Sequence, residues 1–212
     1  GQLLISGLIG PKKPQEAAQW LVPAAKANSA KAQYLLGVLH RQGQGVRQDN
    51  AEASRWLRSA VDHGYAAAYG ELAYLYQSGS GVPRDLAQAA ALYRLGADAG
   101  DAHSQFSLGL LCQSGHGVAT NSVESEKWFR LAAEQGYAQA QHQLGILLSV
   151  RNSPESVAWL QKASQQGVVV SSTRLAELLL DGKLVAKDVP AARRLLDAAK
   201  AKGDSHAIEL LR

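Results

Sequence analysis

The chain has 212 residues, of which 46% are hydrophobic, enough to form a sizeable core. Its 22 Lys and Arg are spread among 18 Asp and Glu, giving a net charge of +4 without the dense basic runs and interleaved aromatics of a nucleic-acid reader. No apolar run is long enough to cross a membrane, and a single cysteine, Cys112, excludes an internal disulfide.

A repeat with a period of 36 residues runs through most of the chain. The residues that recur in register are two loop glycines, a valine and a glycine that ends each unit: Gly43, Gly79 and Gly115; Gly45, Gly81 and Gly117; Val46, Val82 and Val118; Gly64, Gly100 and Gly136. A period of this length indicates stacked supersecondary units that contact mainly their neighbours. We therefore predict one elongated domain over residues 1–212.

In chain order, a partial unit comes first, at residues 1–28, with a helix predicted over 13–27. Gly1 aligns with Gly37, in the middle of a unit, so we expect the sequence to be a piece of a longer chain. Full units then follow at residues 29–64, 65–100 and 101–136.

The unit at 65–100 shows most clearly how each repeat is built. Small and apolar residues at helical spacing predict a first helix over 65–78, and Gly79 ends it in the left-handed conformation. Asp85 can cap a second helix over 86–99. The same pattern predicts helix pairs at 29–42/49–63 and 101–114/121–135, and the caps of the other second helices are Asp49, Asn121 and Asp188.

The fifth unit, residues 137–167, is shorter because the Gly-x-Gly-Val loop is missing and Ser149–Pro154 joins its helices at 137–149 and 153–166 directly. A further full unit follows at 168–203, with helices at 168–181 and 188–202, and a partial one at 204–212. We predict no strand. The predicted fold class is all-α: a right-handed α-solenoid of stacked antiparallel helix pairs, about five full repeats plus partial ends.

A bulky apolar residue recurs at one position of the second helix, as Trp20, Trp56, Trp128 and Trp159, with Leu92 and Leu195 in the other two units. Because these residues share one phase of the repeat, we expect them to pack in the core. Cys112 occupies the position of Tyr76 in its unit, so we expect a buried structural thiol.

These repeats resemble the Sel-1-like repeat, a relative of the tetratricopeptide repeat. The match is carried by the Leu-Gly steps Leu36-Gly37, Leu108-Gly109 and Leu144-Gly145, by the three Gly-x-Gly-Val loops and by the cap that follows each loop. The chain departs from the pattern in its short fifth unit and at His40, Cys112 and Leu148, where a tyrosine is usual. The resemblance implies an adaptor or scaffold, often bacterial and often periplasmic; a cytoplasmic location is the alternative.

Residues with a catalytic task are not apparent. The Gly-x-Gly loops follow helices and lack the lysine of a phosphate cradle, and no two histidines stand at metal-ligand spacing. We therefore predict a non-enzymatic protein without catalytic residues, cofactor or metal.

The positions that vary between units lie on the first helices, which in tetratricopeptide-like arrays form the concave side. Aromatic residues with a polar group are common anchors of protein interfaces. We predict a groove for an extended protein segment, with Lys31 and Arg41 at one end and Glu177 and Asp181 at the other. Its predicted partner-binding residues are Tyr34, Val38, Arg41, Tyr74, Gln77, His103, Phe106, Leu110, Gln113 and His142.

Three alternatives stay open. The aromatic rings of the groove can instead pack against adjacent first helices. The protein can be an immunity protein that neutralises a secreted toxin, or it can bind polysaccharide or peptidoglycan fragments, which requires exposed tryptophans. We expect neither nucleic-acid binding nor membrane insertion, and we expect the ends at Leu3–Ile9 or Leu210–Leu211 to allow a homodimer.

Overall fold

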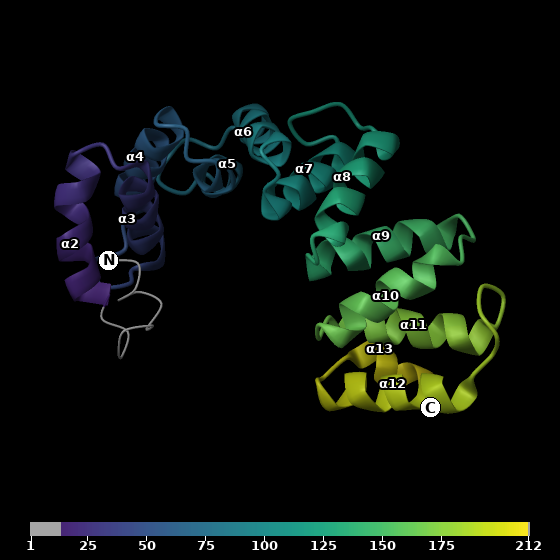
Figure 1. Ribbon diagram of the computed structural model, residues 1–212. Helices are drawn as coiled ribbons and strands as arrows, with labels where there is room; N and C mark the ends of the chain where they lie inside the picture. The colour runs from purple at the N-terminus through teal and green to yellow at the C-terminus, as the bar shows by residue number, and fades with distance from the viewer. Residues whose placement is uncertain (1–13, 212) are drawn as a thin grey trace. The chain divides into compact units, whose positions relative to one another are not determined.

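The computed structural model describes residues 14–211, which form twelve α-helices and no strand (Figure 1). This confirms the all-α prediction for that part of the chain, and each predicted helix boundary lies within two residues of the observed one. The helices are α2 (Pro14–Lys26), α3 (Ala30–Gln42), α4 (Asn50–Asp62), α5 (Ala67–Ser78), α6 (Leu86–Asp98), α7 (Ala102–Ser114), α8 (Ser122–Glu134), α9 (Ala138–Val150), α10 (Glu155–Gln165), α11 (Val169–Asp181), α12 (Val189–Ala201) and α13 (Ser205–Leu210). The expected dimer contact at Leu3–Ile9 lies outside the described residues.

The helices form two compact units that divide between Asn121 and Ser122. Unit 1 contains α2 to α7 and unit 2 contains α8 to α13, and within each unit consecutive helices pack against one another. Helices with odd numbers are the first helices of the repeats and those with even numbers are the second helices.

Helix ends follow the predicted chemistry. The carboxylates of Asp49, Asp85 and Asp188 each accept a hydrogen bond from a backbone N–H three residues on, at 2.8–2.9 Å. This interaction satisfies a donor that the first helical turn leaves free, so it sets the start of α4, α6 and α12.

Small residues let the helices of a pair approach closely. A Cβ atom on Gly37 of α3 would lie 2.6 Å from Cγ of Leu57 on α4, and one on Gly145 of α9 would lie 2.7 Å from Cγ of Leu160 on α10. The Leu-Gly step is therefore a packing requirement: leucine enters the core and glycine admits the leucine of the partner helix.

In two of the Gly-x-Gly-Val loops the second glycine places the loop directly on the preceding second helix. A Cβ on Gly81 would lie 2.2 Å from the carbonyl carbon of Asn50, and one on Gly117 would lie 2.1 Å from the carbonyl oxygen of Leu86. These two loops thus meet the first turn of the preceding second helix, backbone against backbone, and this contact joins one repeat to the next.

The tryptophans are not equivalent. Trp128 and Trp159 are 5% and 8% exposed, which confirms the core prediction for both, and Trp56 is half-buried against the cluster between α2 and α3. The prediction is wrong for Trp20, which is 70% exposed. Ala18 and Leu21 hold α2 against α3, and Trp20 leaves α2 on another face that no described helix covers.

Two other expectations concern Cys112 and the membrane. Cys112 is fully buried, as predicted for a structural thiol. None of the helices within residues 14–211 has both the length and the hydrophobicity required to cross a bilayer.

The loop contact can be tested with two glycines that share a left-handed backbone. Gly64 has φ 75° and open space around its Cα, whereas Gly81 has φ 75° and lies against α4. We expect Gly64→Ala to cost about 1–2 kcal/mol of unfolding free energy from backbone strain alone. Gly81→Ala should cost about 1–3 kcal/mol more, because the loop must move away from α4. Urea unfolding followed by circular dichroism measures both, and equal losses would contradict the close contact.

Candidate partner-binding surface

Arg41, Tyr74 and His103, three of the predicted partner-binding residues, line one pocket of unit 1. The pocket has a volume of about 350 Å³ and is completed by Glu71. Its residues come from the first helices α3, α5 and α7, as the repeat register predicts.

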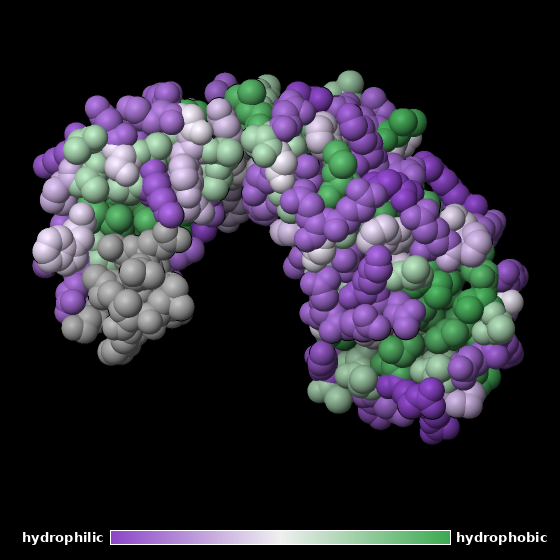
Figure 2. Space-filling model, in the orientation of Figure 1, coloured by the Kyte–Doolittle hydropathy of each residue, from purple (hydrophilic) through white to green (hydrophobic). Residues whose placement is uncertain are grey.

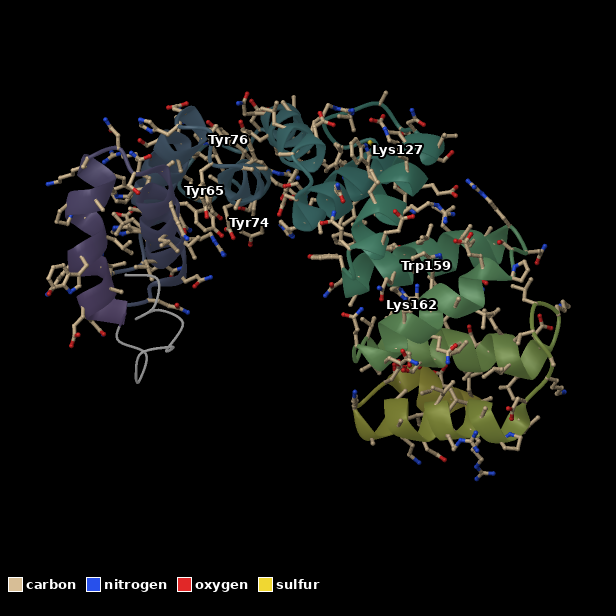
Figure 3. The ribbon with its side chains drawn as sticks, viewed as in Figure 1. Tyr65, Tyr74, Tyr76, Lys127, Trp159 and Lys162 are labelled. Atoms are coloured by element: carbon tan, nitrogen blue, oxygen red, sulfur yellow. The ribbon has the colours of Figure 1, made fainter. Side chains whose placement is uncertain are left out.

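An ion pair between α3 and α5 forms one side of this pocket. Nε of Arg41 lies 2.7 Å from one carboxylate oxygen of Glu71, and a terminal nitrogen of the guanidinium donates to the other oxygen at 3.5 Å. The guanidinium carbon lies 5.7 Å from the centre of the Tyr74 ring, within cation–π range. Tyr74 nevertheless stays 45% exposed, so its ring is available to a ligand. Figure 3 shows Tyr74 and Tyr76 leaving α5 on opposite sides.

His103 reaches the pocket because α7 begins close to α5. Asp101 caps α7 by accepting from the backbone N–H of Ser104 at 2.8 Å. Gly70 of α5 lies opposite, where a Cβ would be 2.9 Å from Ser104 Oγ and 3.3 Å from the His103 ring. Glycine at position 70 therefore permits the approach of α7.

Tyr34, another predicted partner-binding residue, packs against the next repeat and does not line this pocket. Its ring centre lies 5.0 Å from that of Tyr65, which precedes α5, and the ring is half-buried. Burial raises the pKa of the Tyr34 hydroxyl, and the carboxylate of Glu71 adds to the effect. The alternative of rings packed against adjacent repeats thus describes Tyr34, whereas Tyr74 is open.

The other predicted residues of unit 1 are less accessible or more distant from this pocket. Val38, Phe106 and Leu110 are half-buried, and Gln113 is exposed at the end of α7. The amide oxygen of Gln77 accepts from the Tyr93 hydroxyl at 3.0 Å, which links α5 to α6. None of these lines the pocket of Arg41 and Tyr74.

His142, the tenth predicted residue, lies in unit 2 and lines a separate pocket of about 250 Å³. Its Nδ1 lies 2.8 Å from Ser171 Oγ, and burial lowers the pKa of its imidazole. The pocket is formed by the first helices α9 and α11 together with α13, and its other lining residues are Ile146, Val170, Thr173, Arg174, Glu177, Asp204 and His206.

Glu177 is the centre of the charged network in this second pocket. It pairs with Arg174 at 2.7 Å and with His206 Nε2 at 2.7 Å. Burial acts to raise the pKa of Glu177, but the hydrogen bonds from Arg174 and His206 outweigh it, so this pKa lies below its usual value. The hydrogen bond to Glu177 raises the pKa of His206, and the carboxylate of Glu209 adds to it.

Sequence reasoning missed Glu71, Arg174, Asp204 and His206 as parts of these pockets. A signal exists in the numbering: Arg41 and Glu71 are 30 residues apart, Glu177 and His206 are 29 apart, and Thr173 and Asp204 are 31 apart. In an array with a period near 36, this offset joins one first helix to the next. Among the described residues, no group of three or more His, Cys, Asp or Glu is placed to hold a metal ion.

The Sel1 repeat family matches almost the whole chain, at residues 1–29, 30–65, 66–101, 102–137, 138–168 and 170–204. No curated protein matches the chain.

Several solved bacterial structures are similar to the chain. One is c5321, a protective antigen of uropathogenic Escherichia coli strains that displays an SLR fold, with 31% identity and a TM-score of 0.89 over 97% of this chain. The chain spans only 45% of the length of that protein. A Sel1 repeat protein from Oxalobacter formigenes is 29% identical, with a TM-score of 0.84 over 95% of this chain and 84% of its own. The immunity protein Pa5087 from Pseudomonas aeruginosa shares the fold, at 19% identity and a TM-score of 0.58 over 92% of this chain and 78% of its own.

The two histidines of the unit 2 pocket should titrate in opposite directions from the ordinary value of 6.5. We expect NMR titration to place the pKa of His206 above that value and the pKa of His142 below it. Because His206 has the raised pKa in the folded state, its stabilising pair with Glu177 is fully present below pH 6.5 and is lost as pH rises through the raised pKa. The pKa shift of His142 acts on the free energy of unfolding in the opposite direction. The stability that neutral, buried His142 permits is fully present above pH 6.5 and is lost as pH falls through its lowered pKa.

Substitution of the acid gives the control for this titration. Glu177→Gln should return the pKa of His206 towards 6.5. The carboxylate of Glu209 lies 3.7 Å from His206 Nδ1, so Glu209→Gln should change this pKa less. An unchanged His206 pKa in Glu177→Gln would contradict the pairing.

Proposed function

The chain belongs to the Sel1 repeat family, and we propose that it is a non-enzymatic adaptor that binds a protein segment along the first helices of unit 1. We further propose that it serves a bacterial envelope, secretion or signalling system in the periplasm. The resemblance of its repeats to those of bacterial proteins supports the bacterial part of this proposal.

The exposed ring of Tyr74 beside the Arg41–Glu71 pair is the observation that carries the proposal. An aromatic ring can bury a large area at low entropic cost, and here it adjoins groups of both charges. A bound segment can place an apolar side chain on Tyr74, a carboxylate near Arg41 and a donor near Glu71. Two opposite charges at a fixed spacing favour one direction of the bound chain.

The remaining alternatives differ in their support. A polysaccharide binder requires a set of exposed tryptophans, but Trp128 and Trp159 are buried, so the structure does not favour it. Immunity proteins from Pseudomonas aeruginosa share the fold at 19–20% identity, which supports a common architecture only. A single toxin bound one-to-one at about nanomolar Kd would distinguish an immunity protein from an adaptor.

Affinity capture with matched variants tests the proposal. Tyr74→Ala removes the exposed ring of α5, and Leu95→Ala removes a side chain of α6 that is 51% exposed but lies on a second helix. We expect quantitative mass spectrometry to recover one partner with the wild-type chain and with Leu95→Ala. Recovery should fall about tenfold or more with Tyr74→Ala, since interface aromatics are common hot spots.

Melting temperatures of the two variants provide the control. Because both side chains are exposed, each variant should melt close to the wild-type temperature. Full recovery of the partner by Tyr74→Ala, or a large loss of stability in that variant, would overturn the proposed surface.

A further inference from the structure

An apolar pocket of about 490 Å³ opens in unit 2, on helices that the proposed function does not use. It lies between the second helices α10 and α12 and reaches α11 beneath them. Figure 2 shows hydrophobic residues gathered over α10 and α11 with hydrophilic residues around them. Its lining includes Val157, Gln161, Leu179, Ala191, Arg194 and Leu195.

The preceding pair of second helices shows what fills the corresponding place. On α10, the buried Trp159 donates its indole N–H to Glu155 at 2.8 Å. The same carboxylate accepts from Arg130 of α8 at 2.6 Å and 3.3 Å. The hydrogen bond from Arg130, followed by the one from Trp159, lowers the pKa of Glu155. Indole, carboxylate and guanidinium thus form one connected set between α8 and α10, and Figure 3 shows Trp159 beside Lys162 at this site.

The pair α10 and α12 has a smaller, uncharged residue at each of these three positions. The repeat register puts Leu195 at the position of Trp159, Ala191 at that of Glu155, and Gln161 at that of Arg130. All three line the pocket. The pocket therefore lies at the positions that an indole and a carboxylate occupy one repeat earlier, where a pocket of about 390 Å³ remains beside Glu126, Arg130 and Glu134.

The shortened fifth unit contributes to the same opening. Its second helix, α10, has 11 residues, whereas the other second helices of unit 2 have 13. Because α10 begins only at Glu155, it lacks the first residues that the other two helices have at their start. The next loop carries Leu184 in place of the close-contact glycine. Leu184 packs instead against the cluster of Leu160, Leu175 and Leu178. The loop therefore contributes a leucine to an apolar wall here, where the preceding loops have a glycine.

The segment that forms one side of the pocket is rich in basic residues. Residues 182–203 contain six Lys and Arg and only two Asp, so this segment carries as much net positive charge as the whole chain. Arg194 lines the pocket and is exposed. One of the two acids, Asp188, is used by its hydrogen bond to the first turn of α12.

We propose that this pocket binds a segment of a protein partner that presents an aromatic side chain next to a carboxylate. The pocket lacks the indole and the acid that the chain itself supplies one repeat earlier, its lining is mostly apolar, and its one charged lining residue is Arg194. This surface lies on second helices and does not depend on the Tyr74 surface of the proposed function.

Short peptides titrated into the full chain test the chemistry. The probe is Ac-Glu-Trp-Glu-NH2, with Ac-Lys-Trp-Lys-NH2 and Ac-Glu-Ala-Glu-NH2 as controls for charge and for the ring. We expect the first to shift the backbone NMR signals of Val157, Leu179 and Leu195 in a saturable way, with a Kd of about 1 mM, as for a single anchored side chain. The basic peptide should bind about fivefold more weakly or worse, and the alanine peptide should cause no saturable shift.

Three variants locate the site. Leu195→Trp introduces the residue type that the repeat carries at Trp56, Trp128 and Trp159, and it should fill the pocket and abolish the shifts. Arg194→Ser should weaken the acidic peptide about threefold. The neighbouring Arg193→Ser, which is exposed but outside the lining, should not. The two arginine variants keep the test valid even where Leu195→Trp disturbs folding, because both side chains are on the surface.

Several results would overturn the proposal. Equal binding of the acidic and basic peptides would show a merely apolar patch, and full binding by Leu195→Trp or by Arg194→Ser would place the peptide elsewhere. Self-association that Leu195→Trp abolishes, without any peptide binding, would identify a second copy of the chain as the occupant. Tyr74→Ala should leave these titrations unchanged, so this inference and the proposed function can fail separately.

Discussion

The close contact of the Gly-x-Gly-Val loops at Gly81 and Gly117 with the preceding second helix is the constraint on which the stacking of these repeats depends. At Gly81 and Gly117 a Cβ atom would lie within about 2.2 Å of backbone atoms of the preceding helix, so only glycine permits the contact. After two of these loops an aspartate, Asp49 or Asp85, begins the next second helix by accepting from its first turn. Because the contact joins backbone to backbone, it fixes the position of one repeat on another independently of the side chains around it.

Side chains outside these contacts are free to vary, and the candidate surface arises there. On α3, α5 and α7 the core positions are held by leucine, alanine and glycine, whereas Arg41, Glu71, Tyr74 and His103 differ from unit to unit. The period therefore separates residues that build the array from residues that can recognise a ligand. It does not separate an exposed ring from a packed one, as Tyr34 and Tyr74 show.

The short fifth unit is the place where the chain departs most from the repeat. Without the loop between α9 and α10, the second helix α10 starts late, and leucine replaces the close-contact glycine of the next loop at position 184. In the same region Leu195, Ala191 and Gln161 replace the indole, the acid and the guanidinium of the preceding pair. The departures from the repeat thus meet in one place and leave a mostly apolar pocket beside Arg194.

The sequence by itself determined the helices, their ends and the order of first and second helices. The glycines, caps and core residues that set them recur at a fixed spacing, and each acts within one or two helical turns. It also placed Arg41, Tyr74 and His103 on one face through the repeat register. Only the tertiary structure decided which side chains are accessible and which are paired. The burial of Tyr34 against Tyr65, the exposure of Trp20 and the pairing of Arg41 with Glu71 all depend on contacts between different helices. Such contacts depend on the distance and angle between neighbouring helices, which the packed side chains set together and which no single repeat position specifies.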